Sequence, residues 1–494
     1  MSEENKKTEG LHVDKKTLFG IAAILVFIIV IAGVCTQIVP RGQYALDENG
    51  SVIDGSYETL PDYRMPIWKI VLSPVLAFTS SNSVTGAAII AILILVGGTF
   101  LILDKIGVLR YMMAVIVRRF RSRRFLLIAV MVFVGMALSS TAGILEESLT
   151  LVPISVAIAL AMGWDSLTGI GMSFVAVAFG FTAATFNPFN VITVQRLAGL
   201  VTFSGLWLRL IVFAAVYVSL TGFLILYASR IEKHPEKSPA YETDAAYRDR
   251  YSIEECDKAL LDSDSARATK VFLFSLAFVL LGIVLSFVLS VVGAKTDNGL
   301  MSDIGSYSSM GTMAIFFPAG ALAAARVYGL RGKKLFGAFW EGVKTILPVL
   351  PLIIFILAIT YVLNEGMIMH TILHAVASLM NGISPYWVIL LMFAFIAVLE
   401  FFIGSGTAKA FLVVPLMSLL CDLLGVTRQS MVLTFCFADG FTNLLYPTSG
   451  LMIIAIGMVG VSYRKWLRFT APIFLIEGVL SIAFMLLCVA IGYS

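Results

Sequence analysis

The tripeptide Trp207-Leu208-Arg209 recurs 259 positions later as Trp466-Leu467-Arg468. A second match lies nearby, because Gly180-Phe181-Thr182 recurs as Gly440-Phe441-Thr442 at almost the same offset. Self-similarity at a long and nearly constant offset indicates an internal duplication. The chain is therefore expected to contain two related halves.

Most of the chain has the composition of a membrane protein. Of its 494 residues, 59% are hydrophobic and 13% are charged, whereas soluble domains average about 45–50% apolar and about 25% charged residues. Several uncharged stretches exceed the roughly 20 residues that a helix needs to cross a bilayer, namely residues 17–40, 83–103, 210–229 and 271–294. We therefore expect an all-α polytopic protein of the inner or plasma membrane, with the lipid bilayer as a partner.

A polar segment between residues 230 and 270 divides the chain. It carries charges of both signs, together with Pro235 and Pro239, and such a composition is typical of a solvent-exposed linker. The predicted organisation is a tail, a first repeat, a linker, a linking transmembrane helix and a second repeat, at residues 1–16, 17–229, 230–270, 271–294 and 304–491.

Lysine and arginine gather in four short segments, Lys15-Lys16, Arg118–Arg124, Arg326–Lys334 and Arg464–Arg468. Short loops rich in these residues stay cytoplasmic, so we expect a cytoplasmic N-terminus and linker. All four segments fall on one side only if residues 125–160 and 385–421 each enter and leave the membrane on the same side. Equivalent spans then run in opposite directions, which predicts inverted repeats with about nine crossings plus two re-entrant hairpins.

Segment length supports the two hairpins. Residues 125–138 number 14 and would form a helix of about 21 Å, which is shorter than a bilayer core of about 30 Å. We expect the first hairpin to turn at Ser139–Gly143 and the second at Gly404–Thr407, where small and polar residues replace apolar ones.

A broken helix is expected after each hairpin, at residues 166–198 and 429–461. Pro188 and Pro447 interrupt these segments among Asn, Ser, Thr and Gly residues, and a proline inside a helix removes one hydrogen bond and clashes with a carbonyl group. Unwound backbone at membrane depth is tolerated only where protein or water covers it. In a duplicated membrane protein, such broken helices indicate a transporter site.

The tips and the breaks supply candidate binding residues, because free N–H groups of one half-helix favour anions and free C=O groups of the other coordinate cations. We predict substrate binding by small polar residues at these places: Ser139, Ser140, Thr141, Asn187, Asn190, Ser405, Thr407, Asn443, Thr448 and Ser449. The 139–143 tip and the 187–190 break are also candidate Na⁺ sites, and no organic cofactor is expected. The alternative is that these residues only let helices pack closely.

Ionisable side chains within the membrane segments are a sharper signal, because each costs at least about 2.5–3.5 kcal/mol. Glu146 and Glu147 follow the first tip, Lys409 follows the second, and Asp439 lies in the second broken helix. We predict that these four residues carry ion coupling or charge at the site. With Glu400 included, acids outnumber the base, which favours a cationic or zwitterionic solute, a coupling cation or a proton. A structural ion pair of Lys409 with Glu147 or Asp439 is the alternative.

Two further features receive structural interpretations. The repeated Trp207–Arg209 and Trp466–Arg468 segments each begin a span, which is typical of an interfacial anchor. His370 and His374 are four residues apart and are interpreted as part of an interfacial amphipathic helix rather than as a metal-binding pair.

The residues favour a carrier over other classes of protein. The sequence has no GxxxxGK[ST] or HExxH motif and no convincing pair of nucleophile and base, so we expect neither an enzyme nor a nucleic-acid-binding protein. The prediction is a secondary active transporter of a small charged organic solute, with an amino acid favoured by the acid excess. A C4-dicarboxylate or related organic anion coupled to Na⁺ or H⁺ is the alternative, and a passive channel is a remote one.

These motifs together resemble the YfcC-type members of the C4-dicarboxylate anaerobic carrier (DcuC-like) family, in the wider ion-transporter superfamily. The resemblance rests on Gly143–Glu147, Phe186–Phe189, Gly404–Thr407 and Asp439–Ser449. It implies a homodimer with a scaffold domain and a transport domain that moves as an elevator, and some members are associated with basic amino acids such as arginine and ornithine. Lys409 departs from the small or amide residue expected after the second tip, and its fixed ammonium group could replace a bound Na⁺.

Overall fold

A computed structural model of the chain describes residues 15–45, 56–61, 64–79, 83–248, 260–296, 299–347, 350–379 and 382–494. Helices make up 81% of it, which confirms the all-α prediction. Two short strands, β1 (Gly42–Gln43) and β2 (Glu58–Thr59), pair antiparallel, with Gly42 opposite Thr59.

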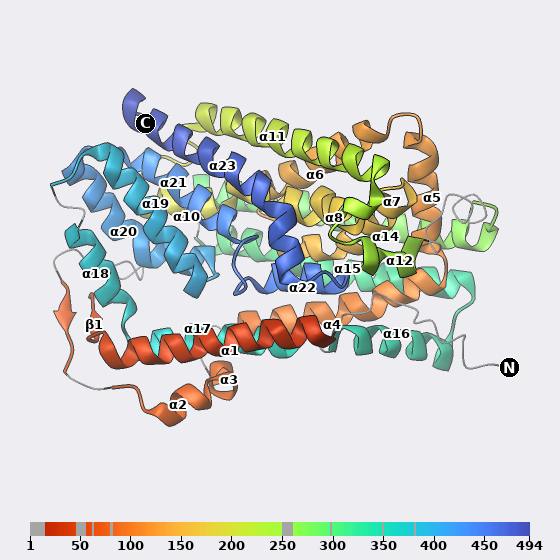
Figure 1. Ribbon diagram of the computed structural model, residues 1–494, viewed down its shortest axis with the longest axis horizontal. Helices are drawn as coiled ribbons and strands as arrows, with labels where there is room; N and C mark the ends of the chain where they lie inside the picture. Colours follow the sequence, from red (N-terminus) through yellow and green to blue (C-terminus); the bar gives the residue numbers. More distant parts are fainter. Residues whose placement is uncertain are drawn as a thin grey trace.

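One set of helices lies along the lower side of the molecule in the view of Figure 1 and includes both N-terminal and central segments. α1 packs against α17, and α4 packs against α16. The helices of the N-terminal segment are α1 (Lys15–Ile38), α2 (Ile67–Val71), α3 (Ser73–Leu76), η2 (Ala77–Thr79), α4 (Ser83–Lys105) and α5 (Val108–Phe120). The central segment forms α14 (Ser263–Lys295), α15 (Gly299–Tyr328), α16 (Gly332–Ile346), α17 (Leu350–Gly366) and α18 (Met369–Leu379).

The predicted hairpins and broken helices belong to a second set, in which α6, α9, α21 and α19 pack in sequence on one another. From the first half come α6 (Arg124–Ala142), η3 (Glu146–Thr150), α7 (Val152–Ala161), α8 (Ser166–Ile170), η4 (Gly171–Val175), α9 (Ala176–Thr182), η5 (Pro188–Ile192), α10 (Thr193–Leu197) and α11 (Leu206–Lys233). From the second come α19 (Pro385–Phe402), α20 (Gly406–Leu424), α21 (Arg428–Thr442), α22 (Gly450–Met458) and α23 (Tyr463–Ile491). The linker contributes η6 (Pro235–Lys237) and α12 (Tyr241–Arg248).

The second helix break contains Pro447 as predicted, the first lies at residues 183–187 just before Pro188, which begins η5, and the first hairpin arm is longer than predicted. α6 has 19 residues, five more than expected, so the argument that this arm is too short to span was wrong. Ser139–Ala142 remain part of the helix, within which the Thr141 hydroxyl donates to the Ala137 carbonyl at 2.7 Å. The helix ends instead at Gly143, whose φ of 73° is in the left-handed region that glycine tolerates.

Five helices in the described ranges are long and apolar enough to cross a membrane: Arg124–Ala142, Leu206–Lys233, Ser263–Gly293, Pro385–Phe402 and Tyr463–Ile491. Five shorter apolar helices accompany them, at residues 25–38, 148–161, 166–182, 314–328 and 350–366. These helices agree with a multi-pass membrane protein. The number of crossings and the inverted arrangement of the repeats remain predictions.

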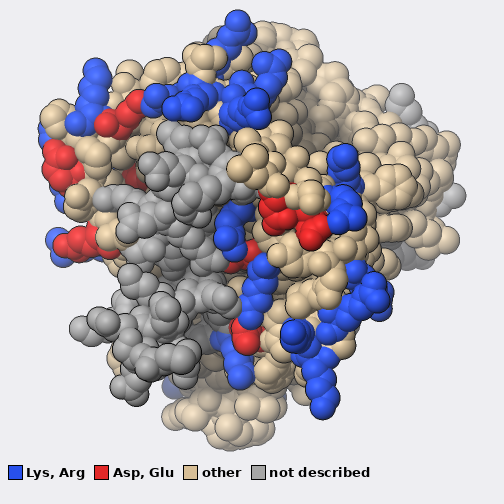
Figure 2. Space-filling view, turned by 90° about the vertical axis from the view of Figure 1, so that its right-hand side faces the viewer, with Lys and Arg blue, Asp and Glu red and all other residues tan. Residues whose placement is uncertain are grey.

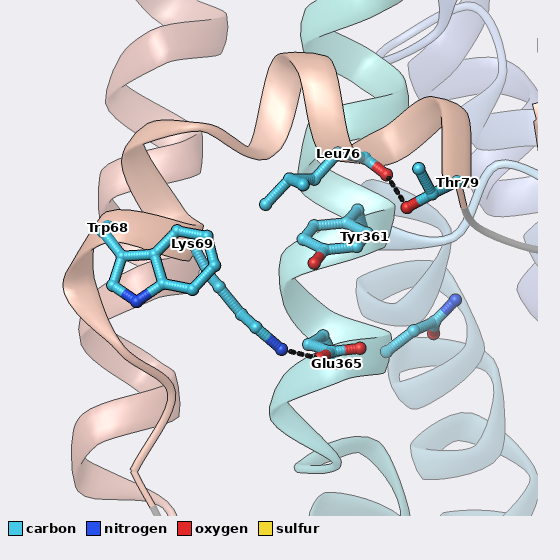
Figure 3. Close-up of a pocket in the computed structure, with 7 residues that line it drawn as sticks. Trp68, Lys69, Leu76, Thr79, Tyr361 and Glu365 are labelled. Carbon is cyan, nitrogen blue, oxygen red and sulfur yellow. Dashed lines mark hydrogen bonds and ion pairs between the residues drawn. The ribbon is translucent and has the colours of Figure 1, made fainter.

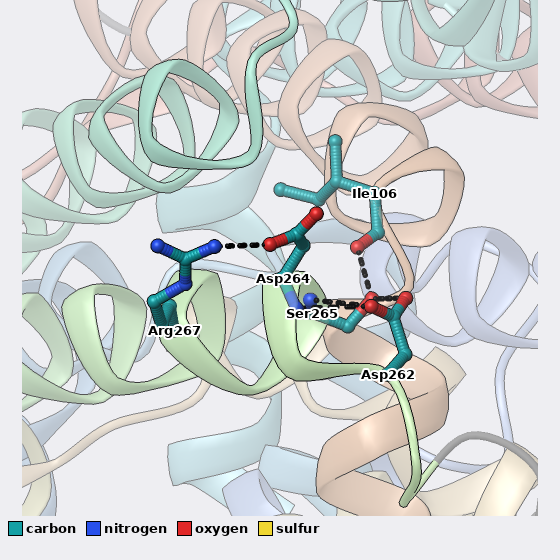
Figure 4. Close-up of polar contacts among 5 residues, drawn as sticks. All are labelled: Ile106, Asp262, Asp264, Ser265 and Arg267. Carbon is teal, nitrogen blue, oxygen red and sulfur yellow. Dashed lines mark hydrogen bonds and ion pairs between the residues drawn. The ribbon is translucent and has the colours of Figure 1, made fainter.

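The long helix α14 is fixed to the end of α4 by a polar cluster (Figure 4). Asp262 caps α14 because its carboxylate accepts the backbone N–H groups of Asp264 and Ser265 at 3.0 and 3.2 Å. The Ser265 hydroxyl lies 2.9 Å from the Ile106 carbonyl, just beyond α4. Hydrogen bonding from Ser265 lowers the pKa of Asp262, so this cap is ionised at neutral pH.

Positive charge is concentrated at one end of the molecule. Figure 2 shows many Lys and Arg side chains on the end where α5 and α12 lie, and the arginine-rich segment Arg118–Arg124 joins α5 to α6. The C-terminus lies toward the opposite end, together with β1 and α18 (Figure 1). Loops rich in Lys and Arg stay on the cytoplasmic side of a membrane, so a basic end agrees with the predicted cytoplasmic N-terminus. The orientation itself stays a prediction.

The β1–β2 hairpin is docked on α18 through aromatic side chains. The Tyr44 backbone N–H donates to His370 Nδ1 at 3.0 Å, and the Tyr44 hydroxyl lies 3.0 Å from His374 Nδ1. Tyr57 stacks on His374 with ring centroids 4.1 Å apart. The two histidines therefore hold the hairpin, and the described part of the chain contains no group of side chains suited to a metal ion.

Acidification is expected to weaken this docking. Burial lowers the pKa of His370 below its usual value of 6.5, and its Nδ1 must be unprotonated to accept the Tyr44 N–H. Since the unfolded chain then binds the proton more readily than the folded one, stability falls as the pH drops below about 6.5. Thermal unfolding of the purified protein at pH 7.5 and 5.5 measures this loss.

A His370→Gln variant should lose less stability between these two pH values than the wild type. His234→Gln is the matched control, because His234 lies in the linker and pairs there with Glu236 at 3.2 Å. An unchanged pH dependence in His370→Gln would contradict the assignment.

The duplicated Gly-Phe-Thr motif marks places where the broken helices approach their neighbours closely. A Cβ atom on Gly440 of α21 would lie 2.5 Å from the Cα and backbone N atoms of Thr182 in α9. A Cβ atom on Gly180 of α9 would lie 2.3 Å from the Met136 carbonyl oxygen in α6. The two glycines thus allow α6, α9 and α21 to pack backbone against backbone.

Replacement of Gly440 by alanine should destabilise the protein by about 1–3 kcal/mol, because overpacking against a backbone forces helices apart. Gly222→Ala in α11 is the control, since a Cβ there would meet nothing within 4 Å. Thermal unfolding in one detergent compares the two. An equal midpoint for Gly440→Ala and Gly222→Ala would show that α9 and α21 do not cross here.

Candidate functional site

The backbone at the first helix break forms hydrogen bonds with Ser140 near the end of α6. The Ser140 carbonyl accepts the backbone N–H groups of Thr185 and Phe186 at 3.0 and 3.1 Å. The Ser140 hydroxyl lies 2.8 Å from the Ala183 carbonyl and 2.9 Å from the Thr185 hydroxyl. Such partners are required because lipid cannot satisfy unwound backbone.

Asn187 and Asn190, both predicted to bind substrate, have different surroundings. The Asn187 side-chain oxygen accepts the N–H groups of Phe189 and Asn190 at 2.9 and 3.2 Å, and its Nδ2 donates to the Ser139 carbonyl at 3.2 Å. Asn187 therefore holds the break in shape. The Asn190 amide is fully buried, and neither its oxygen nor its nitrogen has a hydrogen-bond partner among the residues that the structure describes.

Three charged side chains meet beside the second tip. The Lys409 ammonium in the first turn of α20 contacts Glu400 Oε2 of α19 and lies 2.7 Å from Asp439 Oδ1 of α21. Lys409 is 0%, Glu400 4% and Asp439 1% exposed, so water does not screen these charges. Their attraction is correspondingly strong, and so is the cost of leaving any of them unpaired.

Gly406 connects this charged cluster to the first half of the chain. A Cβ atom on Gly406 would lie 3.0 Å from both Asp439 carboxylate oxygens and 3.1 Å from Asn190 Oδ1. The Asn190 amide from the first broken helix and the Asp439 carboxylate from the second therefore approach the same point of the second tip. These residues, with Lys409 and Glu400, form the candidate functional site.

The other predicted residues of the second half lie around this site in different roles. Asn443 is buried and donates to the Asp439 carbonyl at 2.8 Å, so the two residues share a helix face as expected. Ser449 caps α22 by accepting the Met452 N–H at 3.4 Å, and Thr448 is buried.

Several predicted residues are not brought into the charged cluster by any described contact. The Thr141 hydroxyl is bonded within its own helix, and Thr407 is half-buried. Ser405 is exposed, but its carbonyl accepts the Lys409 backbone N–H at 3.0 Å. The Ser139 hydroxyl is buried without a partner in the described structure. Glu146 and Glu147 are in η3, and their side chains lie outside the described residues, so their predicted role and a Glu147–Lys409 pair stay untested.

The interfacial-anchor interpretation of the repeated Trp and Arg residues was wrong for two of them. Arg209 and Trp466 are fully buried, and the Trp466 indole N–H donates to the Leu444 carbonyl at 2.8 Å. Trp207 and Arg468 are exposed, as anchors would be. The motif alone could not separate these cases, because burial depends on which neighbouring helix covers each side chain.

Two residues of the site were absent from the predicted set. Glu400 was recognised as a membrane charge but not as a site residue, although Glu400 and Lys409 flank the second tip and a hairpin brings its two arms together. Gly406 was treated as part of a turn, and no local signal indicates that Asn190 lies against it.

A pocket of about 490 Å³ lies elsewhere, between α17 and the segment from α2 to η2 (Figure 3). Lys69 pairs with Glu365 across it. Its lining residues are Trp68, Lys69, Leu76, Thr79, Tyr361, Asn364 and Glu365. None of them belongs to the charged cluster, so the pocket is separate from the candidate site.

Comparison with known proteins places the chain in a family. The family model described as "C4-dicarboxylate anaerobic carrier" (DcuC) matches residues 19–490. The Escherichia coli (strain K12) protein named "Putative basic amino acid antiporter YfcC" is 26% identical over 485 residues, which cover 91% of this chain and 92% of that protein. An uncharacterised protein of Haemophilus influenzae is 23% identical over 420 residues, covering 85% and 78% of the two chains.

Two solved structures are similar over most of their length. The YdaH transporter of Alcanivorax borkumensis has a TM-score of 0.49 at 16% identity, covering 97% of this chain and 99% of that one. Neisseria gonorrhoeae MtrF has a TM-score of 0.48 at 17% identity, covering 94% of each chain. The family model covers nearly the whole sequence, and the chain therefore belongs to the C4-dicarboxylate anaerobic carrier family of membrane transporters.

Proposed function

We propose that this protein is a secondary active transporter that exchanges small amino acids with a cationic side chain, of the arginine or ornithine type, across the cell membrane. The observation that carries this proposal is the buried cluster of Lys409, Glu400 and Asp439. Two acids face one base there, and a solute that brings one positive charge balances the cluster. A dicarboxylate would add two negative charges to it.

The name of one relative supports the same direction. The words basic amino acid antiporter occur in the name of YfcC, a relative whose similarity extends over nearly the whole chain. We further propose an elevator mechanism in a homodimer, with the hairpins and broken helices in the moving domain. The proposed orientation has a cytoplasmic N-terminus, in keeping with the basic end of the molecule (Figure 2).

A second candidate cargo is favoured by one observation. Arg209 is fully buried, and its Nη2 donates to the Gln429 side-chain oxygen at 3.0 Å. Its Nε and Nη1 atoms have no hydrogen-bond partner within the described ranges, and a guanidinium group is well suited to a carboxylate. Together with the family name, Arg209 keeps a C4-dicarboxylate coupled to Na⁺ or H⁺ as the alternative.

Counterflow into proteoliposomes separates these cargoes. Vesicles loaded with unlabelled ornithine should accumulate labelled arginine in a saturable manner, whereas succinate-loaded vesicles should not accumulate labelled succinate. Replacing external Na⁺ by choline, and collapsing the proton gradient in parallel, identifies the coupling ion.

Asp439→Asn should reduce arginine counterflow at least about tenfold, because it removes a buried charge from the site. Asp422→Asn is the matched control, since Asp422 is on the same half of the chain and pairs with Arg428 at the surface. Succinate exchange without arginine exchange would support the alternative cargo. Ohmic single-channel currents would instead exclude a carrier.

A further inference from the structure

The buried cluster at the second tip is not balanced in charge or in hydrogen bonds. Lys409 contacts one oxygen of Glu400 and one of Asp439, which leaves one negative charge in excess when both acids are ionised. The positive end of the α20 dipole offsets part of that excess, because Gly406 begins this helix. The remainder is costly in a buried position and calls for a second cationic group.

The polar atoms without partners lie together on the side of Asp439 that faces the first broken helix. Asp439 Oδ2 and both amide atoms of Asn190 are buried and have no hydrogen-bond partner in the described structure. Both Asp439 oxygens and Asn190 Oδ1 lie 3.0–3.1 Å from the position of a Cβ atom on Gly406. Three buried oxygen acceptors therefore lie beside Gly406, and they come from both halves of the chain.

We propose that Asp439, Asn190 and Gly406 form a subsite for the cationic group of the cargo, and that Lys409 is a fixed cation that pairs with Glu400 and Asp439. This proposal rests on the proposed function. A guanidinium or ammonium group donates to the oxygens, while the Asn190 amide nitrogen donates to an acceptor of the cargo. A bare Na⁺ would bind the oxygens alone and leave that nitrogen unpaired.

Lys409 then determines how many positive charges the cargo and any accompanying ion must bring to the site. With Lys409 present, the two acids require one further positive charge, which a cationic amino acid supplies. Without Lys409 they require two, so the cargo would need an accompanying cation. Lys409 acts here as a positioning residue, since its ammonium group contacts the acids rather than the cargo.

Two comparisons test the subsite: one varies the charge of the ligand, and the other fills the subsite with a methyl group without changing its charge. Arginine binding to the purified full-length protein is compared with binding of citrulline, which has a neutral group of the same shape in place of the guanidinium. The wild type should bind arginine and not citrulline. Gly406→Ala should weaken arginine binding roughly tenfold or more, since a hydrogen bond to a charged group contributes about that much.

Gly404→Ala in the same tip is the matched control, because a Cβ there would meet nothing within 4 Å. It should bind arginine as the wild type does. Equal binding by Gly406→Ala and Gly404→Ala would overturn the subsite while leaving the transporter assignment intact. Absence of any exchange of cationic amino acids by the wild type would instead overturn the proposed function itself.

The role of Lys409 has its own test. Lys409→Met leaves two uncompensated negative charges, so its arginine binding should become at least about tenfold stronger in Na⁺ buffer than in choline buffer, whereas wild-type binding should be the same in both. The double variant Lys409→Met with Glu400→Gln restores one net negative charge and should lose this Na⁺ dependence. Arginine binding by Lys409→Met that is the same in Na⁺ and choline buffer would refute the role of Lys409, and gel filtration confirms that each variant is folded.

Discussion

Lys409 carries a positive charge in the interior of a helical membrane protein, where neither water nor lipid can neutralise it. Glu400 of α19 and Asp439 of α21 provide the compensation. The three charges come from three helices. Removing one of them would leave another buried charge without a partner and would destabilise the protein by about 3–5 kcal/mol. The positions of the second tip and the second broken helix are therefore tied to a single ammonium group.

The groups that stabilise the tip and the broken helix differ between the two halves of the chain. In the first half, neutral groups hold the broken helix: the Ser140 carbonyl accepts the Thr185 N–H, and the Asn187 side chain bonds to the backbone on both sides. In the second half, the charged side chains of Lys409, Glu400 and Asp439 meet beside the tip. The site is consequently asymmetric although the sequence is duplicated, and Asn190 and Asp439 reach it from opposite halves.

Local chemistry made much of this arrangement predictable. Pro188 and Pro447 indicated both breaks because each proline removes a helix hydrogen bond and is flanked by Asn, Ser, Thr or Gly. Pro318, Pro415 and Pro472, in contrast, lie inside helices. The first tip was predicted at residues 139–143, whereas α6 continues to Ala142 and ends at Gly143, the last residue of that range. Arg209 and Trp466 were mistaken for surface anchors, because a short motif does not indicate which neighbouring helix covers a side chain.

The sequence by itself determined the membrane class and an excess of acids over one lysine in the membrane segments, and it predicted the duplication and the two breaks. These properties follow from composition and from the covalent limits of proline and glycine. Only the tertiary structure decided that Lys409 pairs with Glu400 and Asp439, and that Asn190 faces Gly406. The reason is that such contacts depend on how closely separate helices approach, and the approach of α9 to α21 is set by the missing side chain of Gly440.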